Sequence, residues 1–211
     1  ISLVNVQKAT LTNIYTLNTT KGVHADNCTD VLIENSLLQS HEGLTLPTTA
    51  SVGAGILINA SSHVAIDACT FQGATLTAPL PTGEASNAIL VQGLTSNISI
   101  QNSTFANWLS TITLNQVTGA VINNCSADAS ALSISNLLEL GSMTSQANDV
   151  SVLNSTFTQK VSSPGFDGIL FLNGAGCLLE NVVVDTLTTS DTNASPYSPG
   201  AIHVGCATNG H

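Results

Sequence analysis

The stretch ISIQN, residues 98–102, together with the Ser103-Thr104-Phe105 that follows it, decides the fold of this chain. Its two isoleucines stand two positions apart, and it ends on an asparagine. Successive side chains of a β-strand point to opposite faces, so this spacing predicts a strand with one buried face. The asparagine, which tolerates left-handed backbone geometry, predicts a sharp bend at the strand's end.

The same template of aliphatic, any, aliphatic, any, asparagine occurs seven times. The copies are ISLVN (1–5), VLIEN (31–35), VAIDA (64–68), ISIQN (98–102), AVINN (120–124), VSVLN (150–154) and CLLEN (177–181). They begin 30, 33, 34, 22, 30 and 27 residues apart, and only Ala68 departs from the final asparagine. A repeat this short cannot bury its apolar face alone, so the pattern predicts a solenoid of stacked units.

A second set of short strands precedes most of these copies by eight or nine residues. Its members are VHA (23–25), ILI (56–58), ILV (89–91), ITL (112–114), LEL (138–140), ILF (169–171) and IHV (202–204). One coil therefore has two short strands, an asparagine turn, a third short strand and a loop. We predict a single all-β domain over residues 1–211: a right-handed parallel β-helix solenoid of about seven coils, with an Asn ladder and long loops on one edge.

This pattern resembles the right-handed parallel β-helix superfamily, which includes pectate lyases, polygalacturonases, phage tailspikes and many bacterial surface passenger domains. The resemblance covers nearly the whole chain and implies the fold, while the function has to come from a site. The lyases rely on a basic residue as proton abstractor, but the chain has no arginine and only Lys8, Lys21 and Lys160. The G-H-G and R-I-K signatures of polygalacturonases are absent too, so we expect no enzyme of these kinds.

Charged residues make up only 8% of the chain, and the net charge is −10. This balance disfavours binding to nucleic acid or to anionic lipid surfaces. No apolar run approaches the roughly 20 residues that span a bilayer, so we expect no membrane insertion. The segment at Ile1 does not have the pattern of a signal peptide, and the chain begins and ends inside repeats. We therefore expect a mature or excised segment of a longer protein.

The outward residues of the first-strand sheet form the candidate ligand-binding column. It consists of His24, Leu57, Leu90, Thr113, Glu139, Leu170 and His203. Three of its members are leucines on a face that should be wet, so either long loops cover them, which we favour, or they belong to a contact surface. The long loops themselves are either a recognition ridge beside this face or tolerated insertions. They run roughly over Gln39–Ala54, Gln72–Asn87 and Thr186–Gly200.

Two carboxylates about 5–9.5 Å apart are enough for a glycosidase. Glu139, Asp167 and Asp128 are the candidates for such a catalytic pair, and the alternative is that all three are solvated surface groups. Asp26 and Asp30 flank a tight turn, but two carboxylates fall short of the roughly six to eight oxygen ligands that Ca²⁺ takes. We therefore expect neither a metal nor a cofactor.

Cys69 and Cys125 occupy the same place in their repeats and should point inward. Two coils separate them, roughly 9–10 Å, which is too far for a disulfide. Eight Asn-x-Ser/Thr sequons also occur, at Asn18, Asn27, Asn59, Asn97, Asn102, Asn124, Asn154 and Asn193. Three of them (Asn102, Asn124 and Asn154) coincide with positions of the predicted Asn ladder, where we expect the side chains to be buried and unavailable for glycosylation.

These observations favour a non-enzymatic extracellular or particle-surface module, structural or adhesin-like, with neutral glycans as candidate ligands. Open ends of a β-helix would template aggregation, so we expect neighbouring coils or partner subunits to cover them. The alternative is a glycoside hydrolase or carbohydrate-binding domain that uses the first-strand face and its loops.

Overall fold

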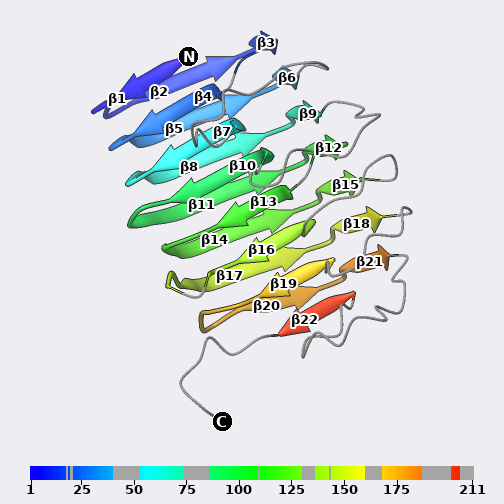
Figure 1. Ribbon diagram of the computed structural model, residues 1–211. Helices are drawn as coiled ribbons and strands as arrows, with labels where there is room; N and C mark the ends of the chain where they lie inside the picture. The colour runs from blue at the N-terminus through cyan, green and yellow to red at the C-terminus, as the bar shows by residue number, and fades with distance from the viewer. Residues whose placement is uncertain are drawn as a thin grey trace, which may run out of the picture.

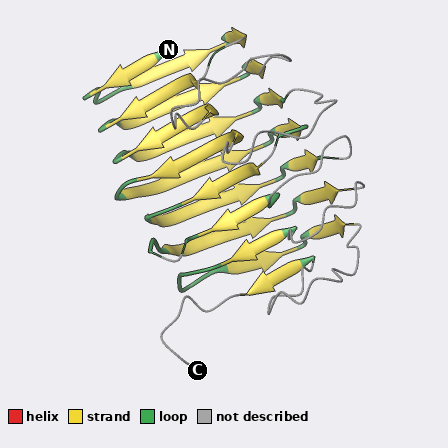
Figure 2. Ribbon diagram, viewed as in Figure 1, coloured by secondary structure: helices red, strands yellow, loops and turns green. Residues whose placement is uncertain are grey.

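The structure is a computed structural model that describes residues 1–17, 19, 21–39, 53–73, 86–108, 110–129, 136–142, 144–159, 168–186 and 201–204. Every regular element in these segments is a β-strand, and the strands stack coil upon coil into three parallel sheets (Figures 1 and 2). No helix in the described segments is long and apolar enough to cross a membrane.

The chain visits the three sheets in turn, one strand at a time. The first sheet has eight strands, in the order β1 (Ser2–Val4), β4 (Lys21–Asp26), β7 (Gly53–Asn59), β10 (Ser86–Gln92), β13 (Ser110–Leu114), β16 (Leu138–Leu140), β19 (Ile169–Phe171) and β22 (Ile202–Val204). The second has seven, in the order β2 (Ala9–Thr12), β5 (Thr29–Glu34), β8 (Ser62–Asp67), β11 (Thr95–Gln101), β14 (Val117–Asn123), β17 (Ala147–Leu153) and β20 (Leu178–Glu180).

The third sheet completes each coil. Its seven strands are β3 (Tyr15–Leu17), β6 (Leu37–Gln39), β9 (Thr70–Gln72), β12 (Thr104–Ala106), β15 (Ser126–Asp128), β18 (Thr156–Gln159) and β21 (Val183–Thr186). The described strands therefore make seven complete coils, from β1-β2-β3 to β19-β20-β21, and β22 follows the last of them. The prediction of an all-β stack of about seven coils is confirmed.

The core is a column of aliphatic and aromatic side chains between the three sheets. Ile33, Ile66 and Ile100 lie in register on consecutive coils of the second sheet and are fully buried. Phe71 and Phe105, contributed by the third sheet, stack with ring centroids 4.7 Å apart. Each such side chain contributes about 1.5–3 kcal/mol when it is fully buried. The in-register columns explain why the aliphatic residues recur at fixed places in each repeat.

The first repeat is not in the sheet that we predicted. We placed residues 1–5 in the second sheet with the other copies of the template, but β1 pairs with β4 in the first sheet. The second sheet instead starts at β2, which pairs with β5. Strands of both sheets end on left-handed asparagines, such as Asn5 (φ 57°) and Asn13 (φ 55°), so the template does not distinguish one sheet from the other.

The bend between the second and third sheets has left-handed backbone in every coil. Its residues are Asn13, Asn35, Ala68, Asn102, Asn124, Asn154 and Asn181, with φ between 48° and 55°. A continuous Asn ladder is not confirmed. Asn124 Nδ2 donates to Asn102 Oδ1 (2.8 Å) and Asn181 Nδ2 to Asn154 Oδ1 (3.1 Å). Elsewhere an outward neighbour from the preceding coil accepts instead: Asp67 Oδ1 from Asn102 (2.7 Å) and Asn123 Oδ1 from Asn154 (2.9 Å).

The expectation that the Asn positions are buried is wrong. All six asparagines at this bend are exposed. At this left-handed corner the asparagine side chain projects outward into solvent, while the side chain of the next residue points into the core. That next residue is Ser36, Cys69, Ser103, Cys125 or Ser155 in five consecutive coils, and all five side chains are buried.

Candidate functional site

The predicted ligand-binding column exists as a geometric feature of the first sheet. Strand register pairs each member with the next, from His24 through Leu57, Leu90, Thr113, Glu139 and Leu170 to His203. All seven therefore lie on one line across the coils. Alternation along the strand places them there, because each stands between two aliphatic or aromatic positions of its strand that point the other way, and from His24 to Glu139 those neighbours are buried. Their role in binding stays a prediction.

The middle of this column is closed to solvent. Leu57, Leu90 and Thr113 are only 5%, 6% and 6% exposed. The two leucines form a small buried cluster with Ala54 that is separate from the main core. Of the two alternatives for the outward leucines, the burial of Leu57 and Leu90 agrees with cover rather than with an open contact surface, whereas Leu170 is half-buried. The loops that we expected to cover them, residues 40–52 and 74–85, lie outside the described residues.

A second column runs beside the first and was missed from the sequence. Register aligns Lys21, Ala54, Asn87 and Ser110, and Asn87 Oδ1 accepts a 2.8 Å hydrogen bond from Thr113 Oγ1 on the next coil. Asn87 stands three residues before the outward Leu90, so strict alternation assigns it to the wrong face. The same spacing of three residues recurs between Asn136 and Glu139, and this recurrence could have indicated the second column from the sequence.

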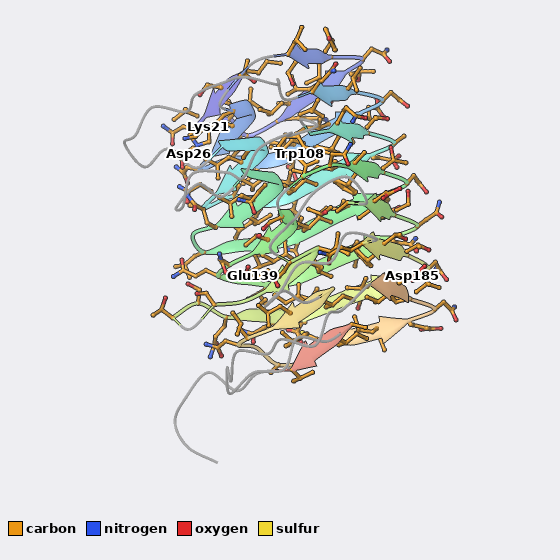
Figure 3. All side chains as sticks on the ribbon, turned by 45° about the vertical axis from the view of Figure 1, so that its right-hand side comes forward. Lys21, Asp26, Trp108, Glu139 and Asp185 are labelled. Carbon is orange, nitrogen blue, oxygen red and sulfur yellow. The ribbon has the colours of Figure 1, made fainter. Side chains whose placement is uncertain are left out.

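Glu139, which Figure 3 labels, is the one carboxylate of the column. It lies in β16, and the strand register places it between Thr113 and Leu170. Its side chain is half-buried. Burial raises its pKa above the ordinary 4.5, and a 3.4 Å hydrogen bond from Asn136 Nδ2 partly opposes the shift. A carboxyl group that keeps its proton to higher pH can donate a hydrogen bond or act as a general acid.

The other two catalytic candidates are not tied to Glu139 by the strand register. Asp128 is exposed and ends β15 in the third sheet, whereas Glu139 lies in the first sheet. Asp167 lies outside the described residues. A catalytic pair therefore stays a prediction.

No group of three or more His, Cys, Asp or Glu side chains suited to a metal ion occurs among the described residues. Asp26 Oδ1 accepts a 2.6 Å hydrogen bond from Asn59 Nδ2, and Asp30 lies 4.0 Å from His63 Nδ1. The two aspartates thus have separate partners, both on the next coil.

Cys69 and Cys125 point inward and are buried, as we predicted. Both are free thiols that point into the core, and Ser103 lies between them on the intervening coil. Burial raises the pKa of Cys125 to about 11, so its thiol stays protonated and unreactive at neutral pH.

Comparison with known proteins agrees with this architecture. Residues 1–184 match the model of the family described as the right-handed β-helix region. The chain therefore belongs to the right-handed β-helix family, in which the fold is shared and activities differ. No curated protein matches the chain.

Proposed function

We propose that the chain is a non-enzymatic structural module of an extracellular or particle-surface protein, with neutral glycans as its ligand class. The observation that carries this proposal is the closed outer face of the first sheet. Leu57, Leu90 and Thr113 are buried there, so the middle of that face offers a covered apolar and hydroxyl strip in place of an open row of reactive groups.

The exposed surface of the third sheet supports the choice of a neutral ligand. Thr70, Thr104, Ser126 and Thr156 are exposed and in register on four consecutive coils. Their hydroxyl groups repeat at the spacing of neighbouring strands, about 4.8 Å. Hydroxyls both donate and accept hydrogen bonds, which matches the chemistry of an uncharged sugar. The chain's scarcity of lysine and arginine also leaves few sites for trypsin-like proteases, as suits an exposed module.

Partners of the module are neighbouring coils or subunits. Leu3 and Leu11, inward residues of the first coil, are only partly buried, whereas their register partners on the next coil, Ala25 and Ile33, are fully buried. A partner that continues the three sheets would cover these side chains and pair the free strand edges.

The test is retention and cleavage of a panel of neutral and acidic polysaccharides by the purified protein. We expect no cleavage of any substrate and retention, where it occurs, of neutral chains. On protein made in bacteria, which carries no N-glycan, Thr104→Val and Thr156→Val together should weaken that retention, whereas Ser99→Ala on the second sheet should not. Cleavage of any polysaccharide would contradict the non-enzymatic role.

A second candidate, favoured by the raised pKa of Glu139, is a glycoside hydrolase or carbohydrate-binding domain that uses the first sheet. In that case Glu139→Gln abolishes cleavage or binding, while the same change at the exposed Glu180 of β20 leaves it intact. Equal activity of the two variants would exclude Glu139 as the acid.

A further inference from the structure

Three sequons lie on consecutive coils of the exposed bend between the second and third sheets. Asn102, Asn124 and Asn154 supply the side-chain amides, and all three are exposed with φ between 48° and 52°. The residue after each asparagine is buried, but the one after that, Thr104, Ser126 or Thr156, is exposed on the third sheet. Both groups that define a sequon therefore lie on the outside of one corner of the solenoid.

We propose that this corner is an N-glycosylation edge, with Asn102 and Asn154 as the acceptors. The inference rests on the proposed extracellular role, because N-linked transfer takes place in the secretory route. In that reaction the asparagine nitrogen forms a bond to the anomeric carbon of a lipid-pyrophosphate-linked oligosaccharide. The carbon–oxygen bond to the pyrophosphate breaks, the pyrophosphate leaves with the electron pair, and the nitrogen loses one proton.

The hydrogen bonds of the corner are compatible with this modification. A side-chain amide nitrogen has two N–H donors, and glycan attachment replaces one of them. Asn102 uses one donor toward Asp67 Oδ1 (2.7 Å), and Asn154 uses one toward Asn123 Oδ1 (2.9 Å). The remaining N–H keeps each contact, so the corner does not have to rearrange around the sugar.

The spacing of the coils selects alternate positions. Neighbouring strands lie about 4.8 Å apart, which leaves too little room for branched glycans side by side on adjacent coils. Asn102 and Asn154 are separated by the coil of Asn124, roughly twice that distance. Glycans on Asn102 and Asn154 can therefore be present together, whereas a glycan on Asn124 would exclude both of its neighbours.

The sequon at Asn59 provides the contrast. Asn59 donates the same kind of hydrogen bond as Asn102, from Nδ2 to Asp26 Oδ1 (2.6 Å), but unlike Asn102 it is half-buried. The hydroxyl of its sequon, on Ser61, is buried and donates to Asn59 O (2.7 Å) while it accepts from Cys28 N (2.9 Å). A glycan at this position would displace packed neighbours, so we expect the folded, secreted protein to lack one there.

The experiment is to produce the chain behind a secretion signal in eukaryotic cells and to map its peptides before and after glycan release by a peptide-N-glycanase. The enzyme converts each modified asparagine to aspartate, so a site that was used gains about one dalton. We expect conversion at Asn102 and Asn154. Absence of glycan from both would overturn the proposal, and a glycan at either supports it.

Three variants test whether the geometry of the corner, and not merely the presence of a sequon, allows glycosylation. Thr104→Val removes the sequon of Asn102 and keeps the branched side-chain shape, whereas Thr104→Ser retains the sequon. The first should lose one glycan and the second should keep it. Leu37→Thr creates a sequon on Asn35, which has the same exposed, left-handed setting (φ 48°), and should add one glycan. No added glycan in that variant would refute the role of the corner's geometry.

Failure of this site and failure of the proposed function give different results. If the extracellular role is wrong, fractionation of the source finds the protein inside the cell, while the chain routed for secretion still carries glycans. If the site is wrong, the secreted chain is unmodified at both acceptors.

Discussion

Ala68 is the one position of the left-handed bend that does not have an asparagine, and replacing it tests the logic of the turn. Its φ is 50°, and its side chain is exposed at the corner. For L-residues the left-handed region costs roughly 1–2 kcal/mol, whereas Asn visits it routinely. Ala68→Asn should therefore raise the free energy of unfolding by about 1 kcal/mol, which corresponds to about 2–4 °C in Tm for a chain of this length.

The assay is thermal and urea unfolding followed by far-UV circular dichroism, on protein made in bacteria so that the new Asn-Cys-Thr sequon is not modified. Ala65→Asn is the matched control, because Ala65 lies three residues earlier in β8 and is not among the left-handed residues. This control should not gain stability. Asn124→Ala should lose about 1–2 kcal/mol for the reverse reason. If Ala68→Asn is no more stable than Ala65→Asn, the left-handed bend does not select asparagine for its backbone.

Three further outcomes follow from the described contacts. Phe71→Ala removes a fully buried ring that stacks on Phe105 and should cost about 3–5 kcal/mol, while Thr70→Ala on the exposed face should cost little; unfolding midpoints measure both. Since burial raises the pKa of Glu139, the folded state binds the proton of this carboxyl group more tightly than the unfolded state does. The stability that the protonated group contributes to the fold is therefore fully present below pH 4.5 and is lost as pH rises through the folded-state pKa. Glu139→Gln should therefore be more stable than wild type at neutral pH, with the gap closing in acid, and a pH-independent difference would contradict this. Thiol labelling at pH 7 should leave Cys125 unmodified in the folded protein and modify it in denaturant, and rapid labelling of the native chain would show that the core is open at that coil.

Much of the fold could be predicted because the sequence repeat identifies which residues of successive coils stack on one another. The aliphatic positions of ISIQN and its relatives recur at one place per coil, and the structure pairs Ile66, Ile100 and Ile122 in register. The first repeat was the failure. Its pattern of Leu3 and Asn5 fits a strand of either sheet, and only pairing with β4 identifies which one.

A second left-handed column also went unnoticed. Just before the first inward residue of the second sheet stand Asp30, His63, Asn97, Gly119, Asp149 and Gly176, all with φ between 53° and 73°. These residue types tolerate positive φ better than the others do, so their recurrence one position before an aliphatic residue was a readable signal. In β11 this residue, Asn97, lies inside a strand that begins at Thr95, three residues before the five-residue template.

The sequence by itself determined the period, the strands and the outward column of the first sheet. These follow from alternation along the backbone and from the left-handed preference of asparagine, both of which are local properties. The tertiary structure alone decided that the bend asparagines are exposed, that Leu57 and Leu90 are covered, and that the pKa of Glu139 is raised. Exposure and desolvation depend on atoms contributed by residues far apart in the chain, and no local pattern contains that information.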